Sequence, residues 1–228
     1  MRKNHYMYMY AFLFVIVIGV IPFPASLASA ESYIGGQLGF TIPESLGGVS
    51  QTGGGARFSN LDLNNSLTYG AKAGHYFERY KWLGVETDLY TTNPHLENQN
   101  ATRTTPGGPT SVIVPGALTR VTTLAFSLMA RYPGEKFQPY AGMGMGVYFA
   151  KAAGSFSKDT DASPGFHLVG GARLFVTKEV ALFGEYKHDR ATFSFPSLPT
   201  GVGTGLTGDY MAHTLVVGVS YHFLPEGR

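Results

Sequence analysis

The chain contains no cysteine and has few charged residues. The lack of cysteine excludes disulfide bonds, thiol catalysis, cysteine metal sites and a lipid-modified N-terminal cysteine. Charged side chains make up 14% of the residues, against about 25% in ordinary soluble domains. Glycine, with 30 residues, and aromatic residues, at 14%, are both abundant. A protein surface that lies entirely in water usually carries more charge than this, whereas a surface that faces lipid needs no charge.

The N-terminal segment has the layout of a secretory signal peptide. Two basic residues open it, an apolar run extends from Ala11 to Ile21, and Ala28-Ser29-Ala30 offers small residues for cleavage. Prolines end the run before it reaches the roughly 20 apolar residues of a spanning helix. We predict that residues 1–30 are a cleaved signal peptide and that residues 31–228 form one exported domain. A retained helical anchor is the alternative.

The exported domain carries no net charge. The signal peptide holds two basic residues and no acidic one, so its removal leaves 15 Lys and Arg against 15 Asp and Glu. The basic character of the whole chain therefore belongs largely to the removed segment, and we predict no nucleic-acid partner. The histidines show no metal-ligand spacing, and the glycine pairs match no phosphate loop followed by a helix. We predict neither a metal nor a cofactor.

Eight segments alternate apolar residues with polar or small ones, which is the period of a β-strand. No helical period is visible after residue 30. Long connections, rich in Gly, Pro, Asn, Thr and Ser, alternate with tight polar turns, an arrangement typical of a transmembrane barrel with its short turns in the periplasm. The strand segments are residues 32–42, 67–77, 82–90, 123–132, 140–149, 165–176, 180–188 and 213–223; the long connections are residues 43–66, 91–118, 151–164 and 194–209.

Alternation alone does not say which face of the sheet lies inside. A soluble lipid-binding barrel packs apolar side chains inward, whereas a membrane barrel turns them toward lipid. The polar face here is rich in glycine, as at Gly142, Gly144 and Gly146. Glycine weakens a water-exposed strand, but it makes room inside an eight-stranded barrel, whose lumen barely holds its own side chains. We therefore predict an all-β, eight-stranded antiparallel up-and-down transmembrane β-barrel, with a soluble periplasmic lipid-binding barrel as the alternative.

Aromatic residues near the strand ends agree with the interfacial girdles of such a barrel. At the short-turn end we place Tyr76, Phe77, Tyr80, Trp82, Tyr132, Phe137 and Phe175, and nearer the long connections Phe40, Tyr90, Phe149 and Phe166.

Three segments, together with the signal peptide, carry a family resemblance: residues 140–144 (YAGMG), 183–187 (FGEYK) and 217–223 (VGVSYHF). The sequence resembles the small outer-membrane β-barrel family that includes the OmpA transmembrane domain, OmpX and Opa-type surface proteins. The resemblance implies a place in the outer membrane of a Gram-negative bacterium. It also implies a non-catalytic role, structural or in surface interaction through the long loops. The implied partners are outer-membrane lipid and lipopolysaccharide, and an extracellular partner of the loops.

The last strand resembles the signal by which the barrel-insertion machinery recognises such chains. That signal is an alternating strand that ends in an aromatic residue. The residues that would carry it are Val217, Val219, Tyr221 and Phe223.

The polar face carries an ionic set that the barrel would enclose. Buried charges must be paired or hydrogen-bonded. Strand neighbours suggest that Lys72 pairs with Glu86 or Asp88, and that Arg173 pairs diagonally with Glu185. We predict that these charges fill and rigidify the lumen, and a narrow ion or solute channel is the alternative. The set is Lys72, Glu86, Asp88, Arg131, Arg173, Glu185 and Lys187.

An enzyme acting on outer-membrane lipids is the remaining alternative. Acyl hydrolysis needs a serine beside a histidine that a carboxylate orients. Glu185, His188 and Ser194 are the nearest approach to such a set, but there is no His-X-Ser pair and His188 has lipid-facing parity. Asp159 and Asp161 form a cation-site candidate, for which a solvated turn is the simpler interpretation. We predict that the protein is not an enzyme.

Overall fold

The computed structural model describes residues 31–51, 55–59, 61–114, 116–153, 158–199 and 204–223. The predicted signal peptide lies outside the described residues, so its cleavage stays a prediction. Among the described residues, no helix has both the length and the apolar character needed to cross a membrane.

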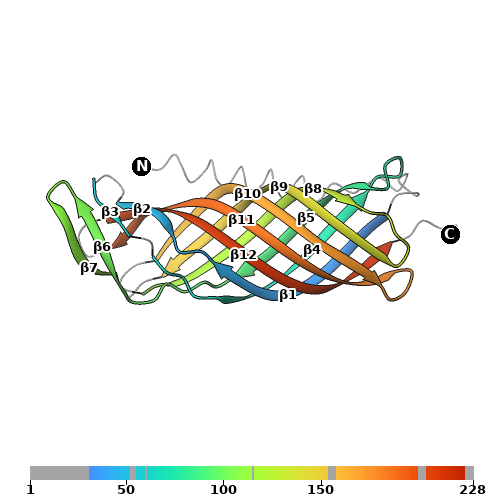
Figure 1. The fold of residues 1–228 in the computed structure, drawn as a ribbon, viewed down its shortest axis with the longest axis horizontal. Coiled ribbons are helices and arrows are strands. Elements are labelled where there is room, and N and C mark those ends of the chain that lie inside the picture. Colours follow the sequence, from blue (N-terminus) through green and yellow to red (C-terminus); the bar gives the residue numbers. More distant parts are fainter. Residues whose placement is uncertain are drawn as a thin grey trace. The chain divides into compact units, whose positions relative to one another are not determined.

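Eight long strands form a closed antiparallel barrel (Figure 1). Successive barrel strands are neighbours around the wall, and β1 pairs with β12 from Ser32↔Phe223 to Pro43↔Ala212 to close it. Each of the eight predicted segments coincides with part of one of these strands, four of them extending one residue past its short-turn end, and the predicted fold class is confirmed. The barrel strands are β1 (Glu31–Pro43), β4 (Ser66–Tyr76), β5 (Leu83–Thr92), β8 (Leu118–Arg131), β9 (Phe137–Ala153), β10 (Lys158–Phe175), β11 (Val180–Pro199) and β12 (Thr204–Phe223).

The first two long connections contain four short strands that extend the sheet. β2 (Gly47–Gln51) pairs with the start of β12, and β3 (Arg57–Phe58), β6 (Gln99–Thr105) and β7 (Gly108–Val114) follow it in that order. We call β2, β3, β6 and β7 the loop sheet, and Figure 1 shows it at the long-loop end of the barrel. Its buried side chains form a small core of their own, made of Val49, Phe58, Leu61, Ala101 and Val114.

The other two long connections are mostly strand as well. β9 continues to Ala153 and β10 begins at Lys158, while β11 continues to Pro199 and β12 begins at Thr204. Most of residues 151–164 and 194–209, predicted as long connections, is therefore strand. A polar and glycine-rich composition does not prevent the antiparallel hydrogen-bond ladder from continuing.

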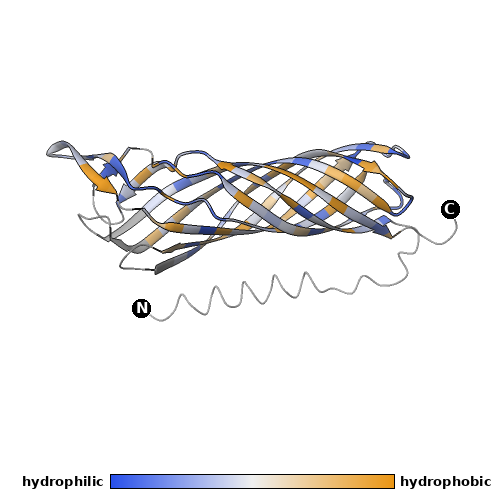
Figure 2. Ribbon diagram, turned by 90° about the horizontal axis from the view of Figure 1, so that it is seen from below, coloured by the Kyte–Doolittle hydropathy of each residue, from blue (hydrophilic) through white to orange (hydrophobic). Residues whose placement is uncertain are grey.

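The two faces of the barrel wall differ as predicted. Met143 and Met145 are 60% and 67% exposed on the outer face. Lys72 and Lys187, in contrast, are buried within the barrel. Figure 2 shows hydrophobic residues recurring along the barrel strands. A closed sheet also pairs the backbone groups of every wall strand, which hydrocarbon surroundings require.

Three residues predicted for the aromatic girdles turn into the barrel instead. Tyr76 and Tyr90 are buried, because they share strand parity with Lys72 and Asp88. Phe175 also turns inward, where its ring centroid lies 4.8 Å from that of His222. The remaining girdle aromatics of the short-turn end are exposed, namely Phe77, Tyr80, Trp82, Tyr132 and Phe137, as are Phe40 and Phe166 nearer the long-loop end.

The inward glycines of β9 permit close contact with the neighbouring strand β8. A Cβ at Gly144 would lie 2.7 Å from the Cα of Ser127 and would clash with the carbonyl oxygen of Phe126. A Cβ at Gly142 would clash with the sulfur of Met129. At Gly170, in contrast, a Cβ would meet no atom within 4 Å.

We therefore predict that Gly144→Ala destabilises the barrel and that Gly170→Ala does not. The clash at Gly144 involves backbone that cannot move away cheaply, so the free energy of unfolding falls by about 1–3 kcal/mol. Urea unfolding in lipid vesicles, followed by the fluorescence of the single tryptophan, Trp82, measures both variants. Equal losses in the two variants would contradict this account of Gly144.

Candidate functional site

The candidate site is the interior of the barrel, where the structure brings the predicted ionic set together. All seven residues of the set are at most 8% exposed. They come from β4, β5, β8, β10 and β11, so the contacts between them join opposite sides of the wall. We call these residues and their hydrogen-bond partners the interior network.

Lys72 is the cation at the centre of the network. Its Nζ lies 3.1 Å from Glu86 Oε1 and also forms an ion pair with Glu185. Glu86 accepts a hydrogen bond of 2.5 Å from the hydroxyl of Tyr33, and Glu185 accepts one of 2.5 Å from Tyr140. Lys72 thus neutralises two carboxylates, and tyrosine hydroxyls occupy further acceptor positions of both.

Lys187 connects this centre to a second carboxylate. It forms an ion pair with Asp88 and lies 3.4 Å from Glu185 Oε2. Gln37 completes a ring, because its Oε1 accepts from Lys187 at 2.7 Å and its Nε2 donates to Asp88 at 2.6 Å. Residues of β1, β5 and β11 are therefore held together across the lumen.

Arg173 pairs differently from the prediction. Its Nη2 lies 3.5 Å from Glu86, and its guanidinium carbon stands 3.9 Å above the ring of Tyr33 and 4.5 Å from that of Tyr140. Cross-strand register suggested Glu185, but a long side chain pointing into a closed barrel can reach residues of distant strands. Stacking on tyrosine faces satisfies the cation where carboxylates are already engaged.

Arg131 forms a separate cluster at the short-turn end. Its Nη1 donates to Glu31 Oε1 at 2.8 Å and to Gln138 Oε1 at 3.1 Å, and its Nε donates to the carbonyl oxygen of Lys81 at 2.9 Å. His222 Nδ1 lies 2.7 Å from the same Glu31 oxygen. The first and last barrel strands are thereby tied to β8 where the wall closes.

The sequence analysis missed a third cluster, around Asp189. Its carboxylate accepts hydrogen bonds from Tyr90 at 2.5 Å and Tyr148 at 2.7 Å, and it lies 2.7 Å from His167 Nδ1. Asp189 has the inward parity of Glu185 and Lys187 on β11. That parity could have identified it, had the predicted strand not stopped at residue 188.

Apolar side chains occupy the interior beyond Asp189, toward the long-loop end. This buried cluster joins β8, β9, β11 and β12, and Leu46 and Leu63 from the first long connection pack against it. Its members are Val121, Tyr148, Ala150, Ala152, Ala191, Phe193, Phe195, Tyr210 and Ala212.

The residues of the predicted insertion signal all lie on the outer face of β12. Val217, Val219, Tyr221 and Phe223 are exposed there. The structure thus gives them a continuous lipid-facing row, and their role in recognition by the insertion machinery stays a prediction.

The residues considered for hydrolysis do not converge. Glu185 is buried inside the barrel, while His188 lies on the outer face of β11, where its ring centroid is 4.9 Å from that of His213. Asp161 Oδ2 accepts a hydrogen bond of 2.7 Å from the backbone N–H of Ser194. The described residues contain no group of three or more His, Asp or Glu placed to hold a metal ion.

Comparison with known families decides the identity of the fold. A family model described as "Outer membrane protein beta-barrel domain" matches residues 11–223. The chain belongs to this family. Membership implies a place in the bacterial outer membrane. No curated protein sequence matches the chain.

Solved structures of outer-membrane barrels share this fold. OprG from Pseudomonas aeruginosa is 14% identical with a TM-score of 0.58, and the match covers 86% of this chain and 97% of OprG. Neisserial surface protein A (NspA) is 13% identical with a TM-score of 0.53, over 86% and 99% of the two chains. At these identities the likeness concerns the fold alone.

We predict that Lys72→Met strongly destabilises this outer-membrane barrel. The change leaves Glu86 and Glu185 buried without their shared cation, and breaking a buried ion pair costs about 3–5 kcal/mol. Urea unfolding in vesicles gives the free energy, and Lys136→Met in an exposed turn is the matched control. The double variant Lys72→Met/Glu86→Gln should recover part of the loss, because it removes one of the two carboxylate charges that lose this cation. If Lys72→Met unfolds like the control, the interior network does not stabilise the barrel.

Proposed function

We propose that this protein is a non-catalytic surface protein of the outer membrane that binds a protein partner through its loop sheet. The free edge of β7 is the observation that carries the proposal. The long-loop end, including the loop sheet, is assigned to the outside of the cell, as in other barrels with short periplasmic turns. Export to this location proceeds with cleavage of residues 1–30.

The loop sheet holds its last strand, β7, beyond the barrel wall. Its own buried core, with Val49, Phe58 and Val114 among its members, supports β6 and β7 beyond the barrel wall. Within the described residues, β7 is the last strand of the sheet and has β6 as its one neighbour. An unpaired edge strand offers a row of N–H and C=O groups that another extended segment can pair with.

The hydrogen bonds of β6 identify which groups of β7 are free. The backbone N–H and C=O of Thr102 bond to Ser59, on the side away from β7. Since backbone groups alternate along a strand, the register partner Ser111 and its alternate neighbour Ile113 direct their N–H and C=O away from β6. Two N–H donors and their carbonyls are therefore available on the open side of β7.

The edge has little of the usual protection against pairing. Natural edge strands carry lysines, prolines or bulges that prevent addition of another strand. β7 reads GPTSVIV, which has no charge and one proline near its start, and Ile113 is 73% exposed. This composition favours partner binding by strand addition.

A channel function has less support from the interior. The interior network places side chains from opposite walls in contact, and the apolar cluster with Phe193 and Tyr210 lies beyond it. An eight-stranded barrel is just wide enough for its side chains to fill. Hydrolysis likewise lacks support, because Glu185 and His188 lie on opposite faces of β11.

Planar-bilayer recordings test the exclusion of a channel. We expect no reproducible conductance steps from the purified barrel. We also expect none from Gly144→Ala, which serves as a control with altered wall packing. Steps that appear in the wild type and vanish when a bulky residue is placed in the lumen would favour the narrow channel.

Peptide selection tests the edge of β7. Phage-displayed 12-residue peptides are selected on the barrel in nanodiscs, and binding is then compared between Ile113→Pro and Ile113→Val. Proline removes a free N–H while leaving the β6–β7 ladder intact, so we expect it to abolish binding that the valine variant keeps. Hydrogen exchange should show protection of the Ser111 and Ile113 amides in the complex. Peptides that bind the proline variant equally, or protect neither amide, would overturn the proposal.

A further inference from the structure

The outer wall of the barrel contains a groove within its lipid-facing surface. The groove has a volume of about 590 Å³ and crosses β12, β1, β4, β5 and β8. Small residues line its middle, namely Gly36, Ala71 and Ala73, and a Cβ at Gly36 would meet no atom within 4 Å. Its volume lies in the range of roughly 300–1,000 Å³ that small-molecule sites occupy.

A row of polar side chains on β5 and β8, which we call the polar column, continues from the groove toward the long-loop end. Leu89 and Leu124, which are register partners on β5 and β8, line the groove. Two positions further, the hydroxyls of Thr91 and Thr122 lie 3.0 Å apart. The column then reaches Arg120, whose Nε donates to Asn93 Oδ1 at 3.0 Å.

The column ends at two cations on neighbouring strands. Arg120 on β8 is the direct register partner of Lys151 on β9, and both side chains are exposed. Directly opposed residues have Cβ atoms about 4.5–5.5 Å apart, and like charges in that position destabilise a sheet. Among the described side chains, no carboxylate forms an ion pair with either cation. Asn93 accepts from Nε of Arg120, and among the described residues no hydrogen bond involves its two terminal nitrogens.

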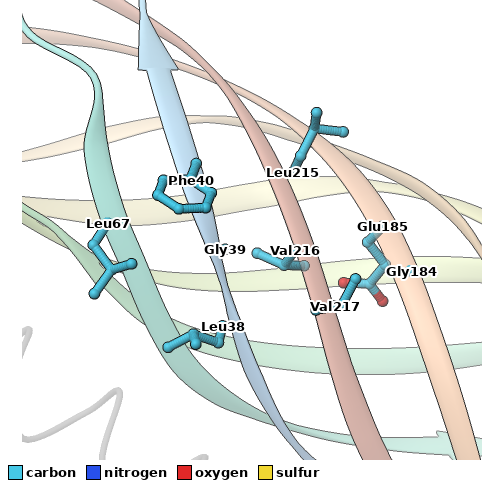
Figure 3. A pocket seen from close by; sticks show the side chains of 9 residues that line it. All are labelled: Leu38, Gly39, Phe40, Leu67, Gly184, Glu185, Leu215, Val216 and Val217. Atoms are coloured by element: carbon cyan, nitrogen blue, oxygen red, sulfur yellow. The ribbon is translucent and has the colours of Figure 1, made fainter.

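A second groove on the same wall lacks these features. It has a volume of about 580 Å³ and is lined by Leu67 of β4, Leu38 and Phe40 of β1, and Leu215 and Val217 of β12 (Figure 3). His213 is the next outward-facing residue of β12 after Leu215. Its ring nitrogen Nε2 lies 2.8 Å from the carboxylate of Glu44. The second groove therefore ends at an acid–histidine pair and serves as an internal comparison.

We propose that the first groove and the Arg120–Lys151 pair together bind one phosphorylated lipid of the outer leaflet. An acyl chain lies in the groove, and a phosphate group of the headgroup bridges the two cations. Charge complementarity selects this occupant, because the groove is apolar and the two cations, which no described carboxylate pairs with, stand at its long-loop end. The site shares with the proposed function only the orientation of the barrel, and the edge of β7 takes no part in it.

Native mass spectrometry of the detergent-purified barrel tests the site with diphosphoryl lipid A. Each Lys or Arg near a membrane surface contributes about 1 kcal/mol to anionic lipid binding. We therefore expect Arg120→Ala and Lys151→Ala each to weaken lipid A binding roughly five-fold, and the double variant about thirty-fold. Arg190→Ala is the matched control. It is also an exposed cation, but its cross-strand partners are Phe166 and Met211, and we expect wild-type binding.

The two grooves supply a second pair of matched variants. Gly36→Leu fills the first groove and Gly184→Leu the second, and in both places a side chain meets open space. We expect Gly36→Leu to weaken lipid A binding and Gly184→Leu to leave it unchanged. Heat-modifiable migration in gels verifies that each variant is folded.

Four outcomes would overturn the site. They are wild-type binding by the Arg120→Ala/Lys151→Ala variant, equal binding of a dephosphorylated lipid A, full occupancy by inorganic phosphate alone, or equal effects of the two glycine variants. Ile113→Pro should not affect lipid A binding, so failure of this site and failure of the edge proposal are distinguishable.

Discussion

Closure of the sheet between β1 and β12 is the constraint on which the rest of the structure depends. In hydrocarbon every backbone N–H and C=O needs a protein partner, and a closed antiparallel barrel supplies one throughout its wall. Closure with eight strands also fixes a narrow interior, into which every second residue points. The inward positions must therefore be small, as at Gly144, or make polar contacts with one another, as Lys72 and Glu86 do.

The interior network follows from this crowding. Its ion pairs join residues far apart in sequence, such as Lys72 with Glu185 and Lys187 with Asp88, because side chains from opposite walls meet at the barrel axis. Tyrosines complete the network by donating hydroxyls to carboxylates, as Tyr140 does to Glu185, while their rings face Arg173. Deleting a single charge leaves its partners buried, so we expect each deletion to destabilise the barrel by more than the loss of one contact.

Much of this architecture could be predicted from residue alternation. Period-two patterning located all eight barrel strands, and the glycine-rich polar face indicated which side lies inside. Strand parity also identified the charged residues of the interior. Applied to every residue of the strands, the same parity would have added Asp189 to that set and placed Tyr76 and Tyr90 inside the barrel. The partner of Arg173 could not be predicted from the sequence for a different reason. Register relates neighbouring strands, whereas contacts across the lumen depend on side-chain length and on the curvature of the wall.

The loop sheet shows a further limit of composition. Residues 99–114 are polar and contain glycine and proline, yet they form the β6–β7 hairpin, because its apolar residues Ala101 and Val114 are buried together with Phe58 of β3. The contacts that make these strands are non-local, so no single segment indicates them. Since packed side chains occupy the interior, the two recognition surfaces we propose lie outside it, at the free edge of β7 in water and on the grooved wall in lipid. The two surfaces use different chemistry, backbone pairing in one and charge with an apolar groove in the other. The two proposals therefore require no coupling between the protein site and the lipid site.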